Sequence, residues 1–302
     1  MIDFIKFKIK AEDKFRFEKS IDSNELVTLK STFDVHTGVA NDYPKMGTLK
    51  NMEIRITEKG AIVKGSMHKY YNLINGLGDQ NYNDFSFEQW EIAIEDLCKK
   101  LDIDKEQTKI TNLEFGFNIP IQMNIKTLIE SHIIMYDLKD HNRKHNFRGR
   151  GSYKEFEKTD YALKVYDKGK PNFILNKNIL RMELKITGSR YLKKLGIVNL
   201  NQLGVHAFKD LFRAFLTHYN KLMIVDSLKA PKGIREDQLI LFKNCINPNH
   251  WSEINTLEKK ETRREFNKLI KKYGHNVFHS ALRDKIYGKY KLLMNLKSLQ
   301  SA

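Results

Sequence analysis

The chain has 302 residues, with 53 Lys and Arg against 37 Asp and Glu, which gives a formal net charge of +16. That charge is unusual for an enzyme of small metabolites and indicates a polyanionic partner, either nucleic acid or an anionic membrane surface. The sequence has no apolar run of about 18 residues, no signal-peptide core and only two cysteines. It therefore predicts a soluble cytoplasmic protein without a membrane span, a disulfide framework or a cysteine zinc site.

The amino-terminal part is expected to consist of strands joined by turns. Residues 51–72 alternate apolar and polar side chains on both sides of a glycine turn and predict a hairpin, whose second strand would carry His68. The composition of 75–84 is typical of a loop. Ser86 then begins a predicted helix, with Gln89 placed to complete a capping box.

The middle of the chain predicts three further strands. Residues 109–120, 160–170 and 178–186 each alternate between apolar and polar positions, so each strand has a core face and an outward face. Between the first two, residues 124–138 predict a helix, and residues 141–153, rich in Arg and Gly, predict a loop.

The carboxyl-terminal part predicts helices. A helix is expected within 203–224, a linker at 227–237, and then two helices that meet at Gly274-His275. We therefore divide the chain into a larger domain, 1–228, and a basic helical region, 229–302. Half-polar strands with a few long helices predict an α+β fold: an antiparallel or mixed sheet with helices on one face and an open polar face.

Basic residues are concentrated in two segments. Residues 231–302 hold 15 Lys and Arg against 7 Asp and Glu, and residues 139–170 hold 10 against 5. Either segment alone is compatible with a solvated basic surface, but together they favour a surface that binds phosphate. The candidate DNA contacts are Arg143, Lys144, Arg148, Arg150, Lys170, Arg263, Arg264, Lys271 and Lys272.

Polar side chains on the outward faces of the three middle strands suggest a site. They are Glu114 and Asn118, then Lys164, Tyr166 and Lys168, then Arg181 and Glu183. If these strands are neighbours, two carboxylates share one surface. Carboxylates about 4 Å apart repel by roughly 4 kcal/mol at an effective dielectric constant near 20, so the pair needs Arg181 or a metal. Oxygen ligands suit Mg²⁺ or Mn²⁺ better than Zn²⁺.

The tyrosine suggests a nucleophile. A free phenol with a pKa near 10 needs roughly 4 kcal/mol to become fully ionised at pH 7, and flanking lysines act in the right direction. The same cations could stabilise charge on a phosphate under attack. The alternative is structural: tyrosine is common in strands, and the acidic and basic residues could form ordinary cross-strand ion pairs. Tyr161, on the apolar face, is better explained as a core residue.

Four stretches in order resemble the rolling-circle replication initiators of small plasmids and filamentous phages. They are "NLEFGFN" (112–118), "LKVYDKGK" (163–170) and "LRMELKI" (180–186), with "KGSMHKYYN" (64–72) as in the phage branch. The resemblance implies an enzyme that nicks DNA at an origin, with residues 1–228 as its catalytic domain and residues 229–302 for DNA binding or assembly. Tyr166 would attack one strand and retain the 5′ phosphate, and the 3′ hydroxyl would be left for a host polymerase.

The resemblance also implies the roles of the other residues. Glu114 and Glu183 would hold Mg²⁺ or Mn²⁺, while Lys164, Lys168 and Arg181 would bind the scissile phosphate. Asn118, where some relatives carry a second acid, and His68 are further candidate ligands. The expected partners are origin DNA, a host helicase and a second copy of the chain, in the cytoplasm of a bacterial host.

Other functions remain open at this stage. No His-hydrophobe-His motif is present, which argues against the other large class of rolling-circle nickases. The main alternative is a non-enzymatic origin- or operator-binding protein, in which the last two helices form a helix-turn-helix. An RNA-binding protein rests on charge and aromatic content alone. A membrane-surface protein has less support, because the basic residues do not accompany an apolar helix face.

Overall fold

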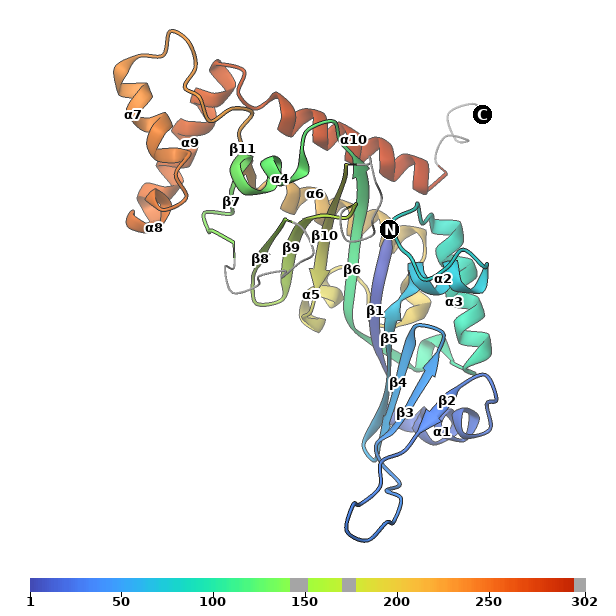
Figure 1. The fold of residues 1–302 in the computed structure, drawn as a ribbon. Helices are drawn as coiled ribbons and strands as arrows, with labels where there is room; N and C mark the ends of the chain where they lie inside the picture. The colour runs from blue at the N-terminus through green and yellow to red at the C-terminus, as the bar shows by residue number, and fades with distance from the viewer. Residues whose placement is uncertain (142–151, 170–177, 296–302) are drawn as a thin grey trace.

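A single large sheet organises the chain in the computed structural model, which describes residues 1–141, 152–169 and 178–295. Within these residues, the strands are ordered β2-β3-β4-β5-β1-β6-β10-β9-β8, and each neighbouring pair is antiparallel (Figure 1). Their bounds are β1 Ile2–Ile9, β2 Thr28–Lys30, β3 Lys45–Leu49, β4 Met52–Thr57, β5 Gly60–Ser66, β6 Thr108–Pro120, β8 Tyr153–Glu157, β9 Tyr161–Asp167 and β10 Ile179–Ile186. The predicted α+β class with an antiparallel sheet is confirmed.

Alternation along the strands separates the sheet into two faces. In β6, Leu113, Phe115 and Phe117 are almost fully buried, while Glu114 between them is turned to the opposite face. Antiparallel register keeps directly opposed residues on one face, so the buried side chains of neighbouring strands pack into one core. We call the two faces the core face and the polar face.

Helices cover the core face. They are α1 (Lys14–Asp22), α3 (Phe87–Lys100), α5 (Ser189–Lys194), α6 (Val205–Tyr219) and α10 (Val277–Leu293), and their buried side chains join the main core. In Figure 1, α5 and α6 lie behind the sheet. Phe215 of α6 packs edge-on against Phe115 and Phe117, with ring centroids 6.4 and 5.2 Å apart. The predicted capping box of Ser86 and Gln89 is confirmed at the start of α3.

A smaller core lies beside the sheet. The two-stranded ribbon of β7 (Ile133–Tyr136) and β11 (Leu222–Ile224) packs against α7 (Glu236–Cys245), α8 (His250–Glu253) and α9 (Thr256–Lys272). The chain then enters α10, whose buried residues belong to the main core again. At this junction the Asp226 amide donates to the His275 carbonyl (2.9 Å), and the Asp226 carboxylate accepts from the first amides of α10.

Three local predictions are wrong. Residues 124–138 form a short helical turn, α4 (Ile125–Thr127), a π-helical turn at 128–132 and then β7. The apolar, β-branched end of this segment pairs with β11, some 90 residues away, and that pairing overrides the helical periodicity. The first 70 residues also contain α1, and the predicted hairpin ends at Ser66, which caps α2 (Met67–Ile74).

Among the described helices, none combines the length and apolar character that crossing a membrane requires.

Candidate active site on the polar face

The three strands that carry the predicted site residues are neighbours. Strand β10 lies between β6 and β9, so Arg181 is opposite Asn118 on one side and opposite Tyr166 on the other. Glu183 is opposite Lys164 in the same way. Glu114 lies one pair further along β6, where it faces Lys185. The register thus places the predicted site residues of β6, β9 and β10 together on one part of the polar face.

Lys164 is the cation that lies between the two glutamates. Its Nζ donates to Glu114 Oε1 at 2.7 Å and lies 3.7 Å from Glu183 Oε2. Burial and the neighbouring Glu183 raise the pKa of Glu114, whereas the pKa of Lys164 is raised because its carboxylate neighbours outweigh its burial. The repulsion expected between the two carboxylates is therefore relieved by Lys164 together with Arg181.

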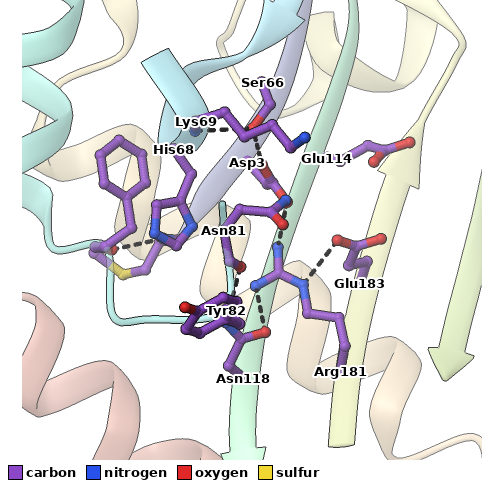
Figure 2. A network of polar contacts seen from close by, with 12 residues as sticks. Asp3, Ser66, His68, Lys69, Asn81, Tyr82, Glu114, Asn118, Arg181 and Glu183 are labelled. Carbon is purple, nitrogen blue, oxygen red and sulfur yellow. Dashed lines mark hydrogen bonds and ion pairs between the residues drawn. The ribbon is translucent and has the colours of Figure 1, made fainter. Parts of the chain in front are cut away.

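Arg181 joins three strands of the site, β10, β6 and β1, through one buried guanidinium. Its Nε donates to Glu183 Oε1 (2.7 Å), its Nη1 to Asn118 Oδ1 (3.2 Å) and its Nη2 to Asp3 Oδ2 (3.3 Å) (Figure 2). The side chain is only 3% exposed. Burial opposes the charge, but the two carboxylates outweigh it and the pKa of Arg181 is raised. With these bonds, the guanidinium chiefly holds other side chains in place.

Asp3 is a member of the site that the sequence analysis did not identify. It also accepts hydrogen bonds from Asn81 Nδ2 (2.8 Å) and from the Ser66 hydroxyl. Burial by itself would raise the pKa of Asp3, but the Arg181 guanidinium, together with Lys168, His68 and the Ser66 hydroxyl, lowers that pKa to about 2. Nothing around Asp3 in the sequence marks it, because it reaches the site only through the central position of β1 in the sheet.

The environment of Tyr166 differs from the expectation. Its hydroxyl donates to Glu183 Oε1 at 3.1 Å, and Lys168 Nζ lies 5.8 Å from the ring centroid. Flanking lysines were expected to lower the pKa of the phenol. Instead burial, followed by the Glu183 carboxylate, raises that pKa well above 10. Burial also lowers the pKa of Lys168. The phenol is therefore held neutral, with its proton directed at a carboxylate.

A second tyrosine lies beside the first. Tyr153 is opposite Tyr166 across β8 and β9, with ring centroids 5.9 Å apart, and its hydroxyl donates to Glu155. Residues 141–153 were predicted to be a loop, which is wrong at Tyr153 because it begins β8. The alternation of "YKEFE" was the signal that could have placed this strand.

His68 and Asn118 hold a neighbouring loop. His68 lies in α2, so its predicted place on a strand is wrong. Its ring stacks on Phe85 at 4.7 Å, its Nε2 is 2.6 Å from Asn83 Oδ1, and burial lowers its pKa to about 3. Asn118 Nδ2 donates to the carbonyls of Asn81 (3.3 Å) and Asn83 (3.2 Å). These contacts fix the loop at the end of the site.

The predicted Mg²⁺ or Mn²⁺ site does not fit this arrangement. A hard divalent cation needs several oxygen ligands, but no group of three or more Asp, Glu, His or Cys side chains in the described part of the chain could hold a metal ion. Between Glu114 and Glu183, the Lys164 ammonium takes the place that a bridging cation would need. A metal could bind this pair only after Lys164 moved.

The predicted DNA contacts are only partly described. In α9, Arg264, Lys271 and Lys272 are exposed, whereas Arg263 is half-buried and donates to the Lys221 carbonyl at 3.2 Å. The remaining predicted contacts, Arg143, Lys144, Arg148, Arg150 and Lys170, lie outside the described residues.

Comparison with known proteins finds similarity among solved structures. No protein-family model matches the chain, and no curated protein matches it. Among solved structures, a rolling circle replication initiator protein from Geobacillus stearothermophilus is similar, with a TM-score of 0.43 and 10% identity over 82% of this chain and 96% of the other. A likeness at this level carries no argument about function, which has to rest on the side chains of the site.

Proposed function

We propose that this chain is a replication initiator that nicks one DNA strand through a covalent bond to Tyr166. The observation that supports it most is the 3.1 Å hydrogen bond from the Tyr166 hydroxyl to Glu183, a carboxylate that Arg181 holds in place. A phenol with its proton directed at a fixed carboxylate, beside Lys164 and Lys168, has a nucleophile, a base and cations for a phosphate within one site.

The raised pKa of Tyr166 determines when its proton leaves during the proposed reaction. Because a free phenolate is disfavoured, the proton passes to Glu183 as the phenolic oxygen bonds to phosphorus. The bond from phosphorus to the 3′ oxygen breaks, and that oxygen takes a proton from Lys168, whose lowered pKa makes it a better acid than a free lysine. The products are a 5′-phosphotyrosine and a 3′ hydroxyl, and the reverse sequence reseals the strand.

The remaining residues act around this step. Lys164 would carry positive charge toward the phosphate, and Arg181 would position Glu183 rather than bind the substrate. Binding of Mg²⁺ or Mn²⁺ by Glu114 and Glu183 would require Lys164 to move, and no step here depends on an ion. The division at 228, the DNA contacts of the basic segments, a helicase partner, a homodimer and a bacterial cytoplasm also remain predictions.

The test is the formation of a covalent adduct. Wild type, Tyr166→Phe and Tyr153→Phe proteins are mixed with 3′-labelled single-stranded oligonucleotides from the DNA that flanks the coding sequence, with EDTA, Mg²⁺ or Mn²⁺. A protease-sensitive adduct is expected on denaturing gels with wild type and Tyr153→Phe, and none with Tyr166→Phe. The Tyr153 variant is the matched control, because it removes the neighbouring hydroxyl from the same face.

Two results would overturn the proposal. An adduct with Tyr166→Phe that is lost in Tyr153→Phe would transfer the nucleophile to the neighbouring strand. Tight binding of the same oligonucleotides by wild type, without an adduct under any condition, would favour the non-enzymatic DNA-binding protein. The closed set of hydrogen bonds around Arg181 is the observation that favours this second function, because those bonds alone would stabilise the sheet.

A further inference from the structure

The polar face continues beyond the candidate site onto the other half of the sheet, where its charged residues are nearly all basic. The cross-strand register places one set of cations on this side of β2, β4, β5, β1 and the start of β6. We call it the basic track, and its members are Lys6, Lys8, Lys30, Arg55, Lys64 and Lys109. Four are exposed and two, Lys6 and Lys64, are half-buried. None of them was a predicted DNA contact.

Like charges in the basic track face one another directly. Lys6 is opposite Lys64 across β1 and β5, and Lys8 is opposite Lys109 across β1 and β6. Directly opposed residues have Cβ atoms about 5 Å apart, and like charges there are destabilising. Over the described residues of this half of the face, one ion pair is present, Lys64 with Glu53 at 2.9 Å. The sheet thus keeps a repulsive arrangement that a polyanion would relieve.

The basic track is continuous with the candidate site. Asn112 is opposite Lys6, and two residues further along the same strand Glu114 is opposite Lys185 and bonded to Lys164. From β10 to β2 there are six steps of about 4.8 Å between strands, so this face extends for roughly 29 Å. That distance equals about eight base pairs at a rise of 3.4 Å.

We propose that the phosphate backbone of the DNA lies along the basic track and leads the strand to Tyr166. The proposal rests on the proposed function for one point, that DNA is the substrate. The position of the phosphate backbone is argued separately, from the positive charge of the face. An anionic membrane fits less well, because membrane-surface binding needs an exposed apolar stripe beside the cations. On this part of the described face the large apolar side chain that is exposed is Met46, which is 38% exposed and has no apolar stripe beside it.

The test compares two triple variants with equal loss of charge. Lys8→Gln/Arg55→Gln/Lys109→Gln removes three exposed cations of the track. Lys193→Gln/Lys194→Gln/Lys209→Gln removes three exposed cations from α5 and α6 on the helical side. Both proteins are titrated into a labelled DNA duplex of about 30 base pairs at several salt concentrations, with fluorescence anisotropy as the readout.

Each lost phosphate contact should reduce the slope of log affinity against log salt by about 0.9. For three contacts the slope falls by about 2.7, so the affinity lost between 50 and 200 mM salt becomes about 40-fold smaller in the track variant. The control should keep the wild-type slope. A wild-type slope in the track variant, or an equal change in both triples, would overturn the proposal.

The identity of the partner is tested with two competing probes. The probes are an RNA duplex of the same length and phosphatidylserine vesicles. If either probe binds more tightly than DNA, and its binding depends on the same three cations, the proposal that the track binds DNA is overturned. Failure of the nicking reaction gives a different pattern. In that case no adduct forms, yet the track variant still changes the salt slope and Tyr166→Phe does not.

Discussion

Asp3 offers a direct test of the buried network, because its charge can be removed without changing its size. In Asp3→Asn one oxygen can still accept from Arg181 and Asn81, while the Ser66 hydroxyl can change from donor to acceptor. The perturbation is therefore the loss of a negative charge beside a guanidinium that is 3% exposed.

The magnitude follows from the pKa of Asp3, which the structure holds at about 2 against a usual value of 3.8. At 1.36 kcal/mol per pH unit, this difference contributes about 2 kcal/mol to the free energy of unfolding. A carboxyl with a lowered pKa provides this stability in full above pH 3.8 and loses it as the pH falls toward 2. Asp3→Asn should thus cost about 2–3 kcal/mol at pH 7, and the difference from wild type should shrink below pH 4.

The assay is urea unfolding followed by far-UV circular dichroism at pH 7 and at steps down to pH 2. Asp84→Asn is the matched control, because Asp84 forms a surface ion pair with Lys289 at 2.7 Å and its side chain is 49% exposed. That substitution should cost less than about 1 kcal/mol. The reasoning fails if the two variants are equally stable at pH 7, or if the deficit of Asp3→Asn stays constant down to pH 2.

Two further predictions concern buried charge. Lys164→Met should reduce the free energy of unfolding by about 3–5 kcal/mol, because Glu114 and Glu183 lose the ammonium between them. Adding Glu114→Gln should restore part of the loss, and additive effects in the double-mutant cycle would contradict the bridge. His218 has a pKa lowered to about 4, mainly by burial, so its stabilisation is complete above pH 6.5 and declines by about 3 kcal/mol toward pH 4. Urea midpoints of wild type and His218→Gln over this range should converge at low pH; parallel curves would exclude the titration.

The sequence was sufficient for the elements that depend on local patterns. The alternation of β9 and β10 gave both their faces, and Ser86 with Gln89 gave the start of α3. The residues of the site on β6, β9 and β10 could be identified because each strand separates apolar from polar side chains by itself. Whether those strands were neighbours was a matter of register, which only the assembled sheet determines.

What the sequence could not show depends on contacts between distant segments. Asp3 and Arg181 are 178 positions apart, and they meet because β1 enters the sheet next to β6. The direction of the pKa of Tyr166 was wrong because neighbours along the strand suggest the local charge but not the burial. The segment of β7 was predicted to be helical because its partner strand, β11, lies far along the chain and the local pattern does not reveal the pairing.

The junction at Asp226 and His275 has a consequence for how the protein can be dissected. Cutting the chain near residue 230 would remove α10, whose Leu282 and Ile286 belong to the main core, and would expose that core to water. The hydrogen bond between Asp226 and His275 instead marks a neck, the point at which the chain leaves the main core after β11 and returns to it before α10. A short linker that replaces helices α7–α9 should therefore leave the sheet with its last helix, at the cost of exposing Ile134, Met135 and Met223 of the ribbon that packs against them. The same neck is a natural point for grafting a foreign domain.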